Sequence, residues 1–185
     1  MQQIGTGYVA PPCGASEHVI LLDDDDQPIG TAEKLDAHRQ GLKHLAISVI
    51  VRDRTGRWLL QRRAAAKYHS GQLWTNTCCS HPRPGEAIVD AASRRLVEEM
   101  GVACPLELAF VTTYRAKVDP DLIEHEVVHV FLGTYEGDIS PDPDEVEAWR
   151  WTTVDDLLKD IDAHPEAYTV WFRHYVEDFL DHMTA

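Results

Sequence analysis

The segment 87–100, AIVDAASRRLVEEM, sets its apolar residues at the spacing of one helical face, and Gly101 follows where a C-terminal cap is expected. It is the clearest helix of the chain. Apolar and β-branched runs precede and follow it, and further helical patterns close the sequence. Because helices and strands must bury their apolar faces against each other, this order predicts an α/β fold arranged as a layered sandwich.

The other elements follow from shorter patterns. An apolar run at 18–22 predicts the first strand, and DDDDQPIG at 23–30 predicts a turn. Four aspartates in a row could bind a cation, but no second ligand cluster stands beside them, which favours a solvated acidic turn. The remaining predictions are a short helix at 35–41 stopped by Gly41, a hairpin of 44–53 with 58–63, strands at 106–116, 126–135 and 145–152, and helices at 153–161 and 166–183.

The glycines and prolines of residues 1–16 predict a flexible N-terminal tail, and no linker divides residues 17–185, which are expected to form a single domain. With 185 residues, 44% hydrophobic and 26% charged, the chain is long enough to bury a sizeable core. Its start lacks the pattern of a signal peptide and no apolar run is long enough to span a bilayer, so we expect a cytoplasmic protein with reduced thiols.

The formal net charge of -14 opposes broad attraction to nucleic acid or to an anionic membrane. Neither is therefore expected as a partner. An anionic ligand would need a local basic pocket or bound metal ions.

The stretch WTNTCCSHPRPGE, residues 74–86, carries two adjacent cysteines. Cys13 and Cys104 lie far off in sequence and neighbouring cysteines rarely bridge, so a disulfide framework is a poor interpretation. A thiol acid or nucleophile, a metal site and ordinary buried packing all stay open. If the segment is extended, Cys79 shares a face with His81, and Cys78 points the other way.

Histidines and carboxylates gather in few places, at His38 and His44, at His81, and in EHE at 124–126. In an extended segment Glu124 and Glu126 share one face. Three imidazoles and two carboxylates would suit Mn²⁺, Mg²⁺ or Zn²⁺. Taken singly, His38 and His44 are better explained as surface histidines, so only their convergence would make a metal site.

Residues 80–102, SHPRPGEAIVDAASRRLVEEMGV, fit most fixed positions of the Nudix box, although composition alone favours an ordinary solvated helix face. Ser80 replaces the initial glycine, and Arg95 replaces the first glutamate of the core. In Nudix hydrolases that glutamate belongs to the Mg²⁺-binding carboxylates, so a cation there argues against ordinary diphosphate hydrolysis. The matching positions are Glu86, Arg94, Leu96, Glu98, Glu99, Gly101 and Val102.

The motifs TNTCCSHP, the altered box, YRA and EHEV occur in an order that closely resembles the type I isopentenyl diphosphate isomerases of the Nudix superfamily. The similarity runs from about residue 17 to residue 172. It implies a Nudix-like fold, a mixed β-sheet flanked by helices. It also implies a monomeric enzyme that converts the small molecule isopentenyl diphosphate to dimethylallyl diphosphate by protonating the terminal alkene carbon and deprotonating the allylic carbon.

The same resemblance implies roles for individual residues. Cys79 and Glu126 match the catalytic thiol and carboxylate, and Tyr114 hydrogen-bonds near that glutamate, while Cys78 is expected to serve packing. Trp171 matches an aromatic whose π face stabilises positive charge. One divalent ion, Mn²⁺ or Mg²⁺ with Zn²⁺ as a further candidate, is implied for His38, His44, His81, Glu124 and Glu126. The diphosphate is assigned to Lys34, Arg63, Lys67 and Arg95, with a second Mg²⁺ held between Glu99 and the phosphate oxygens.

Two other functions compete with isomerisation. A Nudix hydrolase acting on a nucleoside or other diphosphate is the nearest, but the intact cysteine and EHE motif disfavour it. A zinc-stabilised binding module would use Cys78, Cys79 and His81, yet the paired Cys-x₂₋₄-Cys spacing of structural zinc sites is absent.

Overall fold

Strand β3 (His44–Arg52) stands at the centre of the sheet and is buried along all but its last residue. The computed structural model describes residues 17–184, so the predicted tail at 1–16 lies outside the described residues. Strand β8 (Leu122–Thr134) pairs with β3 in parallel, and β6 (Cys78–Ser80) pairs with it antiparallel. The sheet is completed by β1 (His18–Leu22), β2 (Pro28–Glu33), β4 (Trp58–Arg63), β5 (Trp74–Thr75), β7 (Leu106–Asp119) and β9 (Val146–Thr152).

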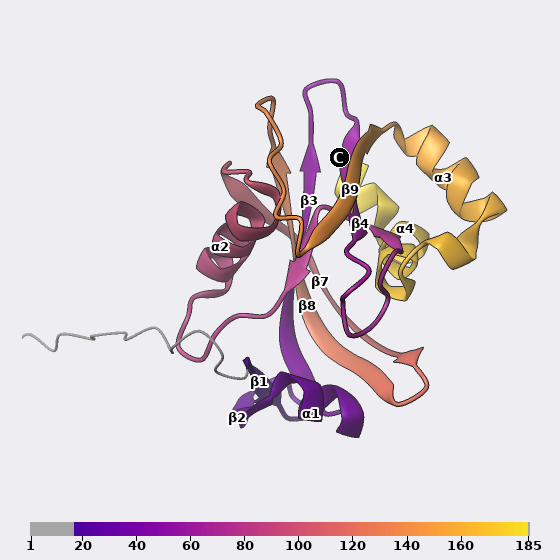
Figure 1. Cartoon of the computed structure of the whole chain (residues 1–185). Coiled ribbons are helices and arrows are strands. Elements are labelled where there is room, and N and C mark those ends of the chain that lie inside the picture. The colour runs from indigo at the N-terminus through magenta and orange to yellow at the C-terminus, as the bar shows by residue number, and fades with distance from the viewer. Residues whose placement is uncertain (1–16, 185) are drawn as a thin grey trace, which may run out of the picture.

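Helices cover both faces of this sheet (Figure 1). Because successive side chains of a strand point to opposite faces, Val49 packs in one cluster with Leu96, whereas Ile50 packs in another with Phe172. The helices are α1 (Lys34–Gln40), α2 (Ile88–Met100), α3 (Val154–Ala163) and α4 (Val170–Thr184), with a 3₁₀ turn, η1 (Pro165–Ala167), before α4. The predicted layered sandwich, a mixed sheet flanked by helices, is confirmed.

Helix α2 agrees with the prediction for 87–100 to within one residue. Ala87 is its extended N-cap, and Gly101 ends it in the left-handed conformation, with φ 67°. The Gly101 N–H bonds Val97 O at 3.0 Å and closes the last turn. The buried face of α2 carries Glu99 among its apolar residues, so the helix aims one carboxyl group into the protein.

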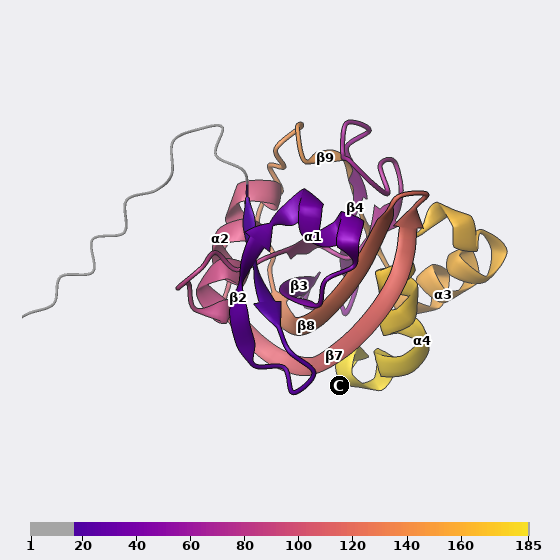
Figure 2. The ribbon, with the colours of Figure 1, turned by 90° about the horizontal axis from the view of Figure 1, so that it is seen from below.

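The hairpin of β7 and β8 is longer than predicted and curves across the sheet (Figure 2). Strands were expected at 106–116 and 126–135, but β7 continues to Asp119 and β8 begins at Leu122. Antiparallel backbone hydrogen bonds extend both strands into a polar stretch that has no apolar pattern. The EHE motif therefore lies inside a paired strand, which fixes the face of the sheet to which each of its side chains points.

Two turns differ from the predictions in their extent. The acidic turn covers 23–27, where Asp23 Oδ1 accepts from the backbone N–H groups of Asp25 and Gln27, and Pro28 already begins β2. The last helix was expected from 166 but begins at Val170. Thr169 N instead donates to Trp74 O at 2.9 Å, which holds this segment extended against β5.

The predicted hairpin of 44–53 with 58–63 is present only at its tip. Strands β3 and β4 pair at Arg52 and Trp58, and then diverge. Strand β6 takes the place beside β3, and β4 pairs with β9 instead. The segment from β5 to β6 lies between the diverging strands, where Thr77 accepts from Val51 N of β3 at 2.8 Å and from Gln61 Nε2 of β4 at 2.9 Å.

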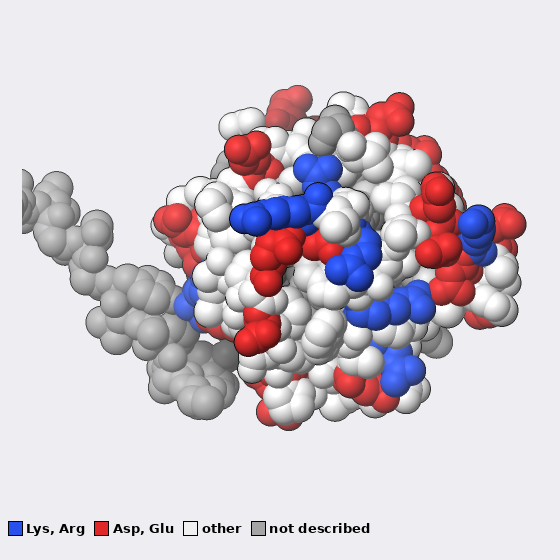
Figure 3. All heavy atoms as spheres, turned by 90° about the horizontal axis from the view of Figure 1, so that it is seen from above, with Lys and Arg blue, Asp and Glu red and all other residues white. Residues whose placement is uncertain are grey.

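Two observations bear on membrane and nucleic-acid partners. None of the helices in the described range combines the length and the apolar character that crossing a bilayer requires. On the face seen in Figure 3, carboxylates lie among and around the basic side chains of the described residues, so no broad basic surface forms there.

We expect Gly101→Ala to destabilise the protein by more than the roughly 1–2 kcal/mol of a left-handed residue, because the new Cβ would lie 2.6 Å from Ser140 O. Gly56 is the matched control, since it also has positive φ, 85°, but no atom lies within 4 Å of the position that its added methyl group would take. Urea unfolding of both variants measures the difference. Equal losses for Gly101→Ala and Gly56→Ala would contradict the close contact.

Candidate functional site

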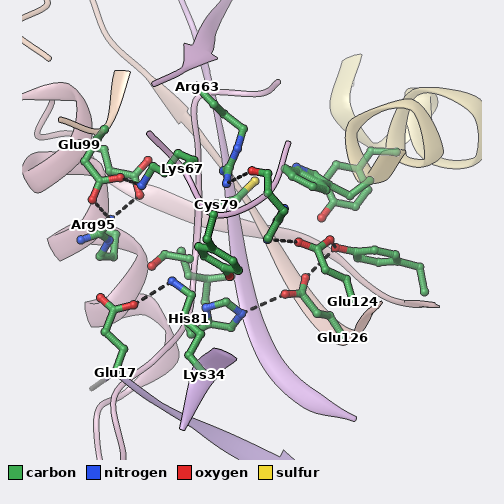
Figure 4. A pocket seen from close by; sticks show the side chains of 18 residues that line it. Glu17, Lys34, Arg63, Lys67, Cys79, His81, Arg95, Glu99, Glu124 and Glu126 are labelled. Atoms are coloured by element: carbon green, nitrogen blue, oxygen red, sulfur yellow. Dashed lines mark hydrogen bonds and ion pairs between the residues drawn. The ribbon is translucent and has the colours of Figure 1, made fainter. Parts of the chain in front are cut away.

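A cavity of about 150 Å³ opens between β3, β6, β8, α2 and α4 (Figure 4). Register explains why chemically active side chains meet in it. Ser48 of β3 pairs with Cys79, and His44 of the same strand pairs with Glu126, four residues along. Because residues four apart on a strand share a face, Cys79 and Glu126 lie on one face of the sheet, on strands that flank β3.

One half of the cavity is basic and is lined by the four predicted anion-binding side chains, Lys34, Arg63, Lys67 and Arg95. Three of them are neutralised by carboxylates of the chain itself. Lys34 Nζ lies 2.8 Å from Glu17 Oε2, and Lys67 pairs with Glu145, which also lies 3.1 Å from Arg95. The sequence analysis did not single out either glutamate.

Arg95 occupies the altered position of the Nudix box and contacts two of the box glutamates. Its Nη2 donates to Glu99 Oε1 at 2.6 Å, and its Nη1 donates to Glu98 Oε2 at 2.8 Å. Burial lowers the pKa of Arg95, but the charge of Glu99 and the hydrogen bonds to Glu99 and Glu98 act together against burial, and the pKa lies above its ordinary value. The other oxygen of Glu99 accepts from Gln61 Nε2 at 3.0 Å, so both its oxygens are already hydrogen-bonded.

The other half of the cavity holds a cluster of three histidines and one glutamate, His38, His44, His81 and Glu126, whose ligand atoms lie within 4.8 Å of one another. Glu126 Oε1 lies 2.9 Å from His81 Nε2 and 3.4 Å from His44 Nε2. The predicted convergence of His38 with the other residues is therefore present, since α1 turns His38 inward and leaves it fully buried.

Glu124 belongs to a second group of potential ligands, with His38 and His69. His69 Nε2 lies 3.2 Å from Glu124 Oε1. The sequence analysis missed His69, because it lies in an irregular loop where no periodic pattern tells which way a side chain points. Only its place shortly before the WTN stretch could have suggested it.

Tyr114 joins the two carboxylates. Its hydroxyl lies 2.5 Å from Glu124 Oε2 and 2.7 Å from Glu126 Oε2. Burial and then the charge of Glu126 raise the pKa of Glu124 well above its usual range. Burial also acts to raise the pKa of Glu126, but the nearby imidazoles of His44 and His81 outweigh it and leave this pKa well below the usual range. The surroundings therefore act in opposite directions on the pKa values of these two neighbours.

The Cys79 thiol is held by a ring of hydrogen bonds. Its Sγ donates to Asn76 Oδ1 at 3.1 Å, Asn76 Nδ2 donates to Ser48 Oγ at 2.8 Å, and Ser48 Oγ lies 3.3 Å from the sulfur. Burial raises the pKa of Cys79 to about 12, although Ser48 and Asn76 act in the opposite direction. The group is thus a protonated thiol in a fixed orientation.

Cys78 points away from the cavity, as the alternation of an extended segment predicts. Its side chain is fully buried in the apolar cluster beneath α2. Cys78, Cys79 and Cys104 are all free thiols. The arrangement leaves Cys78 and Cys79 on opposite faces, so they do not form one zinc site.

Trp171 lines the cavity from α4 and is 2% exposed. The Arg63 guanidinium lies 5.3 Å from the centre of its ring. The tryptophan is therefore both a core residue and a wall of the cavity, and its ring already faces one positive charge.

The histidine cluster fits a divalent ion. His38 Nδ1 lies 2.6 Å from Lys34 O and His44 Nδ1 lies 2.8 Å from Leu42 O, so both rings donate to the backbone and keep Nε2 as an acceptor. His44 Nε2 is buried and has no hydrogen-bond partner among the described residues. Burial lowers the pKa of His81 to about 4, so its ring is neutral at neutral pH, as a metal ligand must be.

Comparison with known proteins gives a consistent picture. The NUDIX domain family matches residues 42–173. The Isopentenyl-diphosphate Delta-isomerase of Burkholderia multivorans is 54% identical over 161 residues, 87% of this chain and 92% of that protein. The Isopentenyl-diphosphate Delta-isomerase 2 of Aromatoleum aromaticum is 52% identical over 155 residues, 84% of this chain and 82% of that protein.

Among solved structures, DR0079 from Deinococcus radiodurans superposes with a TM-score of 0.71 over 88% of this chain and 99% of that chain. The two chains are 15% identical, so this likeness concerns the fold alone. Together with the match to the NUDIX domain, it confirms the expected fold.

We expect pyrophosphate to bind more weakly as the pH rises above about 8. Burial lowers the pKa of Lys67 to about 8, so this ammonium is charged below that pH and neutral above it. Affinity should fall by up to about tenfold per pH unit. Calorimetric titrations between pH 7 and pH 9, in constant Mg²⁺, measure the decline.

Lys67→Arg is the matched control, because a guanidinium stays charged throughout this range. The variant should lose the added pH dependence but keep whatever dependence comes from pyrophosphate itself. The same decline in both proteins would show that Lys67 does not carry it.

Proposed function

The chain belongs to the isopentenyl-diphosphate Delta-isomerases of the NUDIX family, and from this premise we propose how its residues convert isopentenyl diphosphate to dimethylallyl diphosphate. The reaction moves a carbon–carbon double bond by adding a proton to the terminal alkene carbon and removing one from the allylic carbon. The alkene is unactivated, so the protein must supply two proton-transfer groups and shelter a cation-like intermediate from water.

One observation carries the proposal. A protonated thiol, Cys79, and a hydrogen-bonded carboxylate, Glu126, line the same cavity from strands on the two sides of β3. A hydrocarbon lying between them meets one proton-transfer group from each side. One group gives a proton as the other takes one, which is what a shift of the double bond requires.

The surroundings of these two groups support the same chemistry. The Tyr114 hydroxyl oxygen lies 2.7 Å from Glu126 Oε2, within reach for proton exchange with the carboxylate. The ring of hydrogen bonds through Asn76 and Ser48 holds the thiol in place. Trp171 offers a π face to positive charge on the substrate, worth roughly 0.5–2 kcal/mol.

The basic half of the cavity would bind the diphosphate through Lys34, Arg63, Lys67 and Arg95. Charge-assisted donors of this kind suit phosphate oxygens, and the guanidinium groups can contact two oxygens at once. A Mg²⁺ ion between the phosphates and Glu99 would neutralise the remaining negative charge of the diphosphate. Since Glu99 is bound to Arg95 and Gln61, it would approach such an ion through lone pairs that these donors leave free.

The histidine half would hold the second ion, Mn²⁺, Mg²⁺ or Zn²⁺, through His38, His44, His81 and Glu126, with Glu124 as a further carboxylate. This donor set of nitrogen and oxygen atoms suits such ions better than a thiolate site would. When bound, the ion would supply positive charge that orients both carboxylates and alters their acidity.

Hydrolysis of a nucleoside diphosphate is the competing activity within this family. Arg95 counts against it, because its guanidinium pairs with both Glu98 and Glu99, two carboxylates that a hydrolase would offer to Mg²⁺.

The proposal also takes residues 17–185 as one catalytic domain, supported by a sheet that joins the strands of residues 18–152. We also propose that the protein is a monomer and that it lies in the cytoplasm; the three free thiols of the described chain support the reducing compartment.

The decisive experiment incubates the purified protein with isopentenyl diphosphate and Mg²⁺ and follows dimethylallyl diphosphate by NMR. We expect Cys79→Ala to abolish the conversion, because it removes a proton-transfer group. Cys78→Ala should retain most activity, since Cys78 lies in the apolar cluster beneath α2, on the face of β6 opposite to Cys79. Release of phosphate from nucleoside diphosphates without isomerisation would favour the hydrolase, and equal losses from two folded variants would contradict the assigned roles.

Glu126→Gln and Glu124→Gln should separate metal binding from proton transfer. Glu126→Gln keeps the shape and one coordinating oxygen but loses the acid–base group, so turnover should fall by roughly 10²- to 10⁴-fold with the metal retained. Glu124→Gln should chiefly weaken metal retention, and added Mn²⁺ should restore part of the activity. Metal content and turnover are measured on both. Near-normal turnover by a metal-loaded Glu126→Gln protein would assign the proton to another group.

A further inference from the structure

His69 is a buried side chain of the cavity to which the proposed reaction gives no role. It lies in the loop 64–73 between β4 and β5 and is 4% exposed. Arg63 ties this loop to β4, since its Nη2 donates to His69 O at 3.3 Å and its backbone O accepts from Gln72 N at 3.0 Å. Ser70 and Gln72 adopt positive φ values of 50° and 65°. These contacts and backbone conformations restrict the loop, and its His69 side chain lines the cavity.

The imidazole of His69 is fixed on three sides. Its ring lies edge-on to Trp171, with centroids 6.0 Å apart and planes at 88°, and edge-on to Tyr68, at 4.4 Å and 89°. Its Nδ1 lies 3.2 Å from Ser70 Oγ. These contacts direct the remaining nitrogen, Nε2, to Glu124 Oε1 at 3.2 Å.

Glu124 has fewer hydrogen-bonding partners than Glu126, so the contact with His69 matters more for its orientation. Glu126 Oε1 lies near two imidazoles, those of His44 and His81. Glu124 is 4% exposed, and its other oxygen is bound to Tyr114. Without His69, Tyr114 would be the one hydrogen-bonding side chain that the described residues bring to Glu124, and the carboxyl group could rotate about that single bond.

We infer that His69 is a positioning residue of the His/Glu cluster: its Nε2–H donates to Glu124 Oε1 and keeps this carboxylate turned toward the divalent ion. The inference rests on the proposed function, because it requires an ion at the cluster. A carboxylate that ligates an ion is deprotonated and only accepts, so with the ion bound Nε2 of His69 carries the proton, and the Ser70 hydroxyl donates to Nδ1. His69 therefore acts through Glu124 and does not bind the ion.

Direct ligation is the alternative that the geometry raises. The ligand atoms of His38, His69 and Glu124 lie within 4.8 Å of one another, so an ion placed among them could take His69 as a ligand. Its Nε2 would then need a lone pair instead of a proton. Substitution of His69 by glutamine distinguishes the two roles, because glutamine can donate a hydrogen bond but is a poor metal ligand.

The experiment measures Mn²⁺ affinity of the full-length protein after metal removal, from the EPR signal of the free ion. His69→Ala should weaken binding roughly 10- to 100-fold, the usual effect of losing a hydrogen bond to a metal ligand. His69→Gln should recover affinity to within a few-fold of the original protein, because its amide N–H can reach Glu124. Circular dichroism and thermal unfolding confirm that each variant is folded.

His125→Gln is the matched control. His125 lies between the two glutamates in sequence, but its side chain points to the other face of β8, where Nδ1 lies 3.3 Å from Gly41 O. The same substitution there should leave Mn²⁺ affinity unchanged. A loss equal to that of His69→Ala would mean that any change near β8 disturbs the cluster, and would overturn the specific role of His69.

X-ray absorption of the Zn²⁺-loaded proteins adds a direct reading of the ligands. We expect three imidazoles in both the original protein and His69→Gln, and the loss of one imidazole in the variant would make His69 a ligand. Unchanged affinity in His69→Ala, or no recovery in His69→Gln, also overturns the inference. If the original protein binds no divalent ion, the proposed metal centre itself fails, which is a distinguishable result.

Discussion

The pairing of β3 with a strand on each side is the constraint on which the site depends. Because β3 is buried over nearly its whole length, a shift of one residue against β6 or β8 would turn every apolar side chain of the shifted strand to the wrong face. The hydrophobic core therefore fixes the register. The same register brings Cys79 and Glu126 to one cavity, so the energy that stabilises the fold also holds two polar groups in place.

The cavity joins two electrostatic environments, and each would be unfavourable if its charged groups were unpaired. One half gathers cations in a protein of net charge -14, and the other buries two carboxylates beside each other. Each is stabilised by contacts within the chain: glutamates pair with the cations, and histidines and Tyr114 hydrogen-bond to the carboxylates. Buried charges are tolerated only when they are paired in this way.

The sequence predicts best what depends on short periodic patterns. Helix α2 and its end at Gly101 follow from spacing and cap chemistry, and the alternation of an extended strand places Cys79 and Cys78 on opposite faces. The assignment of single residues to roles came instead from resemblance to a family. Lengths of β7 and β8 were underestimated, because pairing of their backbones continues through residues such as Lys117 and Asp119 that carry no apolar signal.

What the sequence could not predict lies in irregular segments. Glu17 precedes the first strand, Glu145 precedes β9, and His69 lies in a loop with left-handed residues. No local pattern states where such side chains point, since their direction depends on which distant elements pack beside them. Each meets a predicted residue, so the family motifs identify the centre of the site but not the side chains that surround it.

The pairing of cavity cations with glutamates sets a threshold for what can bind there. Lys34 and Glu17 form one pair, and Lys67 and Arg95 share Glu145. An entering anion must replace contacts that the protein already makes, so chloride or a monophosphate gains little over the resident carboxylates. A ligand with two linked phosphates and an accompanying Mg²⁺ can displace them all at once. If the cavity binds the diphosphate as proposed, selectivity for highly charged ligands would arise from competition with the protein's own glutamates, before any contact with the hydrocarbon is made.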